Sequence, residues 1–101
     1  MSLRQEKDRQ YFSWVRQELI NLVNGQDNVV LDLGCGEGET GYELKRQGKA
    51  QEVVGIELVE EAANRAKEKL DRVIGGDIEK LGLPFAKEYF DYILRGMSWS
   101  I

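Results

Sequence analysis

One stretch decides the fold: Val29-Val30-Leu31-Asp32-Leu33-Gly34-Cys35-Gly36-Glu37-Gly38-Glu39-Thr40-Gly41. Four of its first five residues are apolar, which predicts a short buried strand. The glycines at 34, 36 and 38 then predict a tight turn in which the backbone can approach a ligand closely. A helix is expected to open behind this turn. The pattern is typical of a site for a nucleotide-type cofactor.

Outside this stretch the chain alternates helical and strand patterns. Strands are expected over 29–33, 52–57, 72–74 and 89–94. Helices are expected over about 8–23, with Gly25 at its end, over 39–47 and over 59–70, with one helical turn over 78–83. This alternation predicts a parallel sheet in an α/β domain. The 101 residues fit a single domain.

Composition excludes several classes of function. The chain has no histidine, which excludes Ser-His-Asp catalysis, Cys-His catalysis and histidine-ligated metal sites, and no metal is expected. Cys35 is the only cysteine, so no disulfide within the chain is expected and a reducing, cytoplasmic location is favoured. A net charge of -4 argues against nucleic acid as a partner, and no apolar run approaches the ~20 residues of a membrane span.

Three acidic residues follow or end the first three expected strands. They are Asp32, Glu57 and Asp77. In a doubly wound sheet these positions lie along the carboxyl edge, where ligands bind. Glu57 could accept both hydroxyls of a ribose, and Asp77 could accept from an exocyclic amine of a base. Asp32 is placed to orient the glycine turn or to meet a cation through water.

The charge of the turn helps to choose between cofactors. Gly36, Gly38 and Gly41 also satisfy the G-x-G-x-x-G pattern of dinucleotide-binding proteins, which hold a pyrophosphate. The region from 28 to 42 contains three acidic residues and no lysine or arginine. Such a turn repels a pyrophosphate and suits a ligand that carries positive charge. A dinucleotide-dependent oxidoreductase fragment is therefore disfavoured, although it stays an alternative.

The segment from Val30 to Gly38 resembles motif I of the class I S-adenosylmethionine-dependent methyltransferases. The family's later signals are present as Val53-Val54-Gly55-Ile56-Glu57-Leu58, then Gly76-Asp77-Ile78, then Leu83-Pro84-Phe85 leading to Phe90-Asp91-Tyr92-Ile93-Leu94. The resemblance implies a Rossmann-like parallel sheet, here with about four strands in the order 3-2-1-4 and flanking helices. It also implies S-adenosylmethionine as the cofactor.

The resemblance further implies which residues contact the cofactor: Asp32, Gly34, Cys35, Gly36, Gly38, Glu57, Leu58, Asp77, Ile78 and Arg95. The turn backbone would meet the methionine part, and Glu57 would hold the ribose hydroxyls with Leu58 packed on the adenine. Asp77 would accept from the adenine amine near the Ile78 amide. Arg95 or its neighbour Leu94 would lie near the methionine amino group. No catalytic residue is assigned, and Cys35 is not expected to be a nucleophile.

The family core has seven strands, and this sequence supplies patterns for four. We therefore expect the cofactor-binding half of a methyltransferase, without the strands that provide much of the acceptor site. One edge of the sheet would then be bare at the fourth strand, and exposed strand edges associate. A homodimer is expected, either through this edge or through a C-terminal segment that buries Met97, Trp99 and Ile101.

Two functions compete. In the first, the protein transfers a methyl group from S-adenosylmethionine to an acceptor that the sequence does not identify. In the second, it is a binding or assembly module that keeps the cofactor site and has no catalytic activity.

Overall fold

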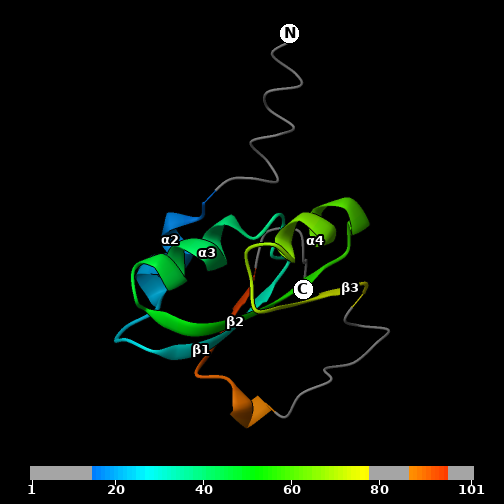
Figure 1. Ribbon diagram of the computed structural model, residues 1–101. Helices are drawn as coiled ribbons and strands as arrows, with labels where there is room; N and C mark the ends of the chain where they lie inside the picture. Colours follow the sequence, from blue (N-terminus) through cyan, green and yellow to red (C-terminus); the bar gives the residue numbers. More distant parts are fainter. Residues whose placement is uncertain (1–14, 78–86, 96–101) are drawn as a thin grey trace, which may run out of the picture.

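The computed structural model describes residues 15–77 and 87–95, which form a parallel sheet with α-helices packed on one face (Figure 1). The elements in chain order are α2 (Gln17–Leu22), β1 (Asn28–Leu33), α3 (Glu39–Arg46), β2 (Ala50–Glu57), α4 (Glu60–Ala66), β3 (Arg72–Gly75), the 3-10 helix η1 (Lys87–Tyr89) and β4 (Tyr92–Arg95). The strand order is β3-β2-β1-β4, and all three pairings are parallel. The predicted order 3-2-1-4 is therefore confirmed. Expectations for 8–14, for the turn over 78–83, for Ile78 and for Met97, Trp99 and Ile101 fall outside the described residues.

The sheet separates two apolar clusters because successive side chains of a strand point to opposite faces. Figure 1 shows α2, α3 and α4 together on one side of the strands. The cluster on this side contains Ile20, Val23, Val30, Cys35, Leu44, Ala50, Val53, Ala66, Leu70 and Leu94. The cluster on the other side contains Leu31, Leu33, Val54, Ile56 and Phe90. Asp32 shares the helix-covered side with Val30, since the two lie two residues apart on β1.

The first helix differs from its prediction. Arg16 is extended, with φ -95° and ψ 93°, so one continuous helix through residue 23 is wrong. The Arg16 N–H donates to Thr40 Oγ1 of α3 at 2.9 Å, a tertiary contact that the local pattern does not reveal. The helix also ends at Leu22, three residues before Gly25, because Val23 is extended and fully buried.

The boundaries of two later elements are also corrected. The helix expected over 59–70 ends at Ala66, because Glu68 and Lys69 donate to carbonyls three residues back and continue as tighter turns. The fourth strand begins at Tyr92, not at Tyr89, which belongs to η1 and donates its hydroxyl to Glu52 Oε1 at 2.6 Å. No helix in 15–77 or 87–95 is long and apolar enough to cross a membrane.

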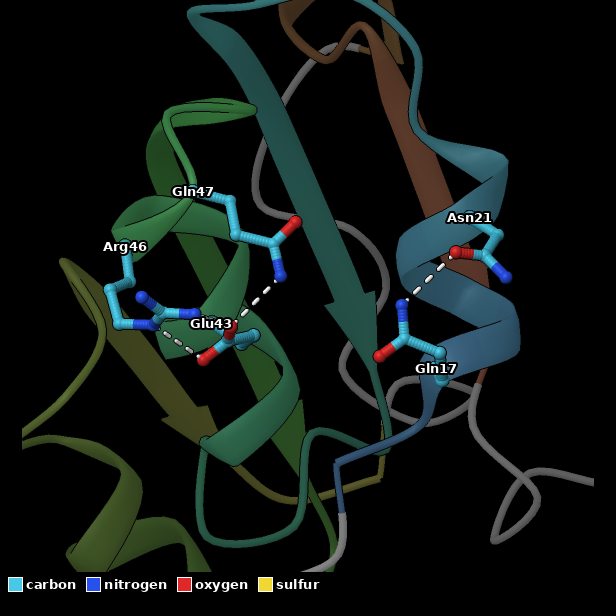
Figure 2. Close-up of polar contacts among 5 residues, drawn as sticks. All are labelled: Gln17, Asn21, Glu43, Arg46 and Gln47. Carbon is cyan, nitrogen blue, oxygen red and sulfur yellow. Dashed lines mark hydrogen bonds and ion pairs between the residues drawn. The ribbon is translucent and has the colours of Figure 1, made fainter.

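The solvent sides of α2 and α3 carry local polar contacts (Figure 2). Gln17 Nε2 donates to Asn21 Oδ1 at 3.0 Å along α2. On α3, Glu43 accepts hydrogen bonds from Arg46 and from Gln47. Hydrogen bonds from these two side chains lower the pKa of Glu43 to about 2. Arg46 and Gln47 are exposed and Glu43 is half-buried, so this ion pair offers a control for other pairs of the molecule described below.

Candidate functional site

The glycine turn after β1 is held against β2 by its own backbone. Gly34 and Cys35 donate their N–H groups to the Ile56 carbonyl at 2.7 and 3.1 Å. Gly34, Gly36 and Gly38 have φ values of +75°, +60° and +91°, in the left-handed region that side chains disfavour. The predicted turn therefore has glycine at these three positions because glycine adopts positive φ at little steric cost.

Glu57 at the end of β2 ties three segments together. Its side chain is buried, with 3% of the residue exposed. Oε1 accepts from the Gly36 N–H at 2.7 Å, and Oε2 accepts from the Val59 N–H at 3.0 Å. The Glu57 carbonyl accepts from the Gly76 N–H at 2.9 Å, just after β3. Each carboxylate oxygen can accept more than one hydrogen bond, so these contacts leave acceptor capacity for a ligand hydroxyl.

Asp32 is a buried carboxylate without a hydrogen bond from any residue in 15–77 or 87–95. Only 2% of it is exposed. Burial raises its pKa from 3.8 to about 7, while the positive charge of Arg16 opposes this rise and the negative charge of Glu57 adds to it. An ionised carboxylate in this environment is stabilised by a nearby cation. Among the described residues, the charge of Arg16 offsets only part of the cost of burying this carboxylate.

Cys35 lies inside the turn and is 7% exposed. Burial raises the pKa of its thiol, and the charges of Asp32 and Glu57 raise it further. A thiol kept protonated in this way is a poor nucleophile. The geometry therefore gives Cys35 a packing role inside the turn.

The charge of the turn differs from its appearance in the sequence. Glu37 Oε2 pairs with Arg65 Nη1 at 2.8 Å, and Glu39 Oε1 pairs with Lys69 Nζ at 2.7 Å. These cations lie on α4 and on the turns after it, far along the chain from the glycines. The turn is therefore less negative than its composition suggests, because two of its three carboxylates are paired with cations.

The remaining predicted positions lie along the carboxyl edge of the sheet. Leu58 follows Glu57 and is 44% exposed, so its side chain is accessible to a ligand ring. Asp77 is partly buried two residues after β3, and Arg95 ends β4 opposite Leu33 of β1. The structure therefore brings the ends of β1, β2, β3 and β4 together at one edge.

Sequence reasoning missed four residues that shape this region: Arg16, Thr40, Arg65 and Lys69. A local signal existed for two of them, because positions 65 and 69 are four apart and so face the same way on a helix. No signal of that kind marked the contact between Arg16 and Thr40.

Parallel strands in the order β3-β2-β1-β4, a glycine turn after β1 and helices against the sheet define the Rossmann-like class of α/β folds. A family model described as a methyltransferase domain matches residues 30–100. The chain belongs to this family, the class I S-adenosylmethionine-dependent methyltransferases.

Known proteins agree with this assignment. The chain is 40% identical over 91 residues to 23S rRNA (uracil(1939)-C(5))-methyltransferase RlmD of Aeromonas hydrophila, covering 79% of this chain and 20% of that protein. It is 42% identical over 72 residues to an uncharacterized RNA methyltransferase of Clostridium acetobutylicum, covering 63% of this chain and 15% of that protein. The structure of a TehB-like SAM-dependent methyltransferase from Corynebacterium glutamicum shares the fold, with a TM-score of 0.67, 24% identity and coverage of 92% of this chain and 52% of that one. The chain thus spans about a fifth or less of the two curated relatives.

Proposed function

We propose that this chain binds S-adenosylmethionine at the carboxyl edge of the sheet, as the cofactor-binding part of a methyltransferase. The observation that carries the proposal is Asp32, which is buried beside the glycine turn without a hydrogen bond from the described residues. S-adenosylmethionine bears an ammonium and a sulfonium group, so it would add positive charge near this carboxylate beyond that of Arg16. Family membership provides independent support.

In this proposal, different residues at the carboxyl edge of the sheet contact different parts of the cofactor. Glu57 has spare acceptor capacity for the ribose hydroxyls, and Leu58 offers an exposed apolar side chain to the adenine. Asp77 and Ile78 are proposed for the amine side of the base. The turn from Gly34 to Gly38, together with Arg95, is proposed for the methionine part.

When bound, S-adenosylmethionine supplies an electrophilic methyl group, whose bond to sulfur breaks as the acceptor forms its own bond to carbon. The chain contributes by fixing the position and orientation of the donor, which is a large source of rate in a reaction of two molecules. We assign no general base. Burial raises the pKa of the Cys35 thiol and makes it a poor nucleophile, so we propose no covalent bond between Cys35 and an acceptor.

RNA is the acceptor class that we propose to test first, because both curated relatives are named as RNA methyltransferases. The net charge of -4 disfavours broad RNA contact by this chain alone. Transfer of a labelled methyl group to ribosomal RNA is the measurement. Cofactor binding without transfer to any acceptor would favour the alternative of a non-catalytic module, and the single cysteine leads us to propose a cytoplasmic setting for either.

Replacing Glu57 tests the cofactor proposal. Glu57→Gln keeps an acceptor for one of the two backbone N–H groups but removes the charge that a ribose hydroxyl would meet. A hydrogen bond to a charged group contributes about 1.5–3 kcal/mol, so we expect the dissociation constant for S-adenosylmethionine to rise at least ~10-fold in titration calorimetry.

The control is Glu18→Gln, the same change at an exposed position of α2, which should bind like the wild type. Binding of a nicotinamide dinucleotide in place of S-adenosylmethionine would overturn the proposal and favour the oxidoreductase alternative.

We also propose that two copies of the chain associate along β4. Within the described residues β4 is paired on one side only, with β1, and Ile93 on it is 42% exposed. Ile93→Lys should therefore lower the mass measured by light scattering toward that of a monomer. Leu22→Lys changes a more exposed residue on α2 and should leave the mass unchanged. A wild-type protein that stays monomeric at high concentration would rule the association out.

A further inference from the structure

The glycine turn after β1 forms ion pairs with two cationic side chains that come later in the chain, Arg65 and Lys69. Arg65 Nη1 lies 2.8 Å from Glu37 Oε2, and Lys69 Nζ lies 2.7 Å from Glu39 Oε1. Lys69 Nζ also donates to the Glu37 carbonyl at 3.2 Å, so it holds the backbone of the turn as well as a side chain. Each pair joins positions about 30 residues apart in sequence, so neither is a local helix contact.

The glycine turn also packs against α4 and the turns that follow this helix. A Cβ added at Gly38 would lie 3.2 Å from Ala66 Cα and 3.3 Å from Leu70 Cγ. Arg65 and Ala66 are followed four residues later by Lys69 and Leu70, so one stripe supplies both the ion pairs and the apolar floor. The stripe belongs to α4 and its trailing turns, which lead on from Glu57.

We infer that Arg65 and Lys69 are positioning residues, which hold the glycine turn in the conformation that the cofactor needs. This inference rests on the proposed binding of S-adenosylmethionine at the turn. It assigns Glu37 and Glu39 to anchoring the turn and not to contacting the ligand.

The conformation of the turn explains why the two ion pairs made by Arg65 and Lys69, together called the clamp, affect cofactor binding. Gly36 and Gly38 adopt positive φ, and glycine populates other regions as readily, so the turn has alternatives when its contacts loosen. The pairs are partly exposed, with 12% of the Glu37 side chain and 59% of the Arg65 side chain accessible. Pairs of this kind have small individual effects, so their combined loss should weaken cofactor binding by about 3- to 10-fold without unfolding the protein.

The test compares two double variants of the full chain. Arg65→Gln with Lys69→Met removes the clamp. Arg46→Gln with Lys45→Met is the matched control, because it also removes one arginine and one lysine from ion pairs, with Glu43 (Figure 2) and Asp71, away from the glycine turn. The readouts are the dissociation constant for S-adenosylmethionine by calorimetry and amide hydrogen exchange at 34–42 in the unliganded protein.

Loss of the clamp should raise the dissociation constant about 3- to 10-fold and speed exchange in the turn, while the control changes neither. As single variants, Arg65→Gln should bind S-adenosylmethionine more weakly than the wild type, whereas Arg65→Lys should keep most of the affinity, since an ammonium can still pair with Glu37. Equal affinity and equal exchange in both double variants would overturn the inference. If the wild type binds no S-adenosylmethionine, the proposed function fails, whereas the exchange data still decide whether the clamp holds the turn.

Discussion

Asp32→Asn should stabilise the unliganded protein at alkaline pH. Burial raises the pKa of Asp32 from 3.8 to about 7, so between these values the folded state holds a proton that the unfolded state has released. Wild-type stability therefore falls as pH rises through this window, and asparagine removes that dependence. The shift corresponds to roughly 4 kcal/mol as an upper bound, and we expect about 2 kcal/mol because the new amide is also buried without a donor.

Urea unfolding at about pH 5 and about pH 8 measures the effect, since the advantage of Asp32→Asn should grow between these values and level off above pH 7. Asp27→Asn is the control, because it makes the same change at an exposed residue with φ of 57°, which asparagine tolerates. The same Asp32 variant should bind S-adenosylmethionine more weakly. A stability difference that does not change with pH would show that Asp32 does not titrate as described.

Gly55→Ala should destabilise the protein by about 3 kcal/mol, toward the upper end of the costs of overpacking a core. An added Cβ at this position of β2 would lie 2.6 Å from Cys35 Sγ and 2.8 Å from Leu70 Cδ1. Both neighbours are buried, so neither can move aside cheaply. The strand and the glycine turn would be pushed apart, and cofactor binding should weaken with stability.

Thermal and urea unfolding test this second expectation. Adding Cys35→Ala removes the sulfur that the new methyl would meet and should recover part of the loss. Gly48→Ala is the comparison, because its Cβ would meet nothing within 4 Å and its cost of ~1 kcal/mol would come only from a φ of +77°. If Gly55→Ala matched Gly48→Ala, the close packing beneath the turn would be refuted.

The sequence was sufficient to predict the sheet because its signals are local. Apolar runs and glycines marked β1 and its turn, and the alternation of patterns predicted a parallel sheet. The strand order itself came from the resemblance to the methyltransferase family, and the structure confirms it. The predicted boundaries of two elements were wrong where a residue hydrogen-bonds to a partner far along the chain. Tyr89 has the pattern of a strand residue, but its hydroxyl bonds Glu52, and the chain forms a 3-10 turn there. Arg16 likewise leaves the helical conformation, with its N–H bonded to Thr40.

The candidate site, like the fold, could be predicted where the signals are local and not where distant residues meet. The positions of Asp32 and Glu57 at the carboxyl edge follow from strand ends alone, and the structure confirms that placement. The partners of Glu37 and Glu39 could not be derived, because a single sequence does not show which cations the folded chain brings near. The turn was therefore judged more negative than it is.

The carboxylate of Glu57 joins two backbone segments, one through each oxygen. One oxygen grips the backbone at Gly36 and the other grips it at Val59, just before α4 begins. A ligand hydroxyl bonded to this carboxylate would therefore contact the side chain that joins both backbone segments. Val59 directly precedes the exposed start of α4 at Glu60 and Glu61. The glycine turn and the start of α4 are thus joined through one side chain.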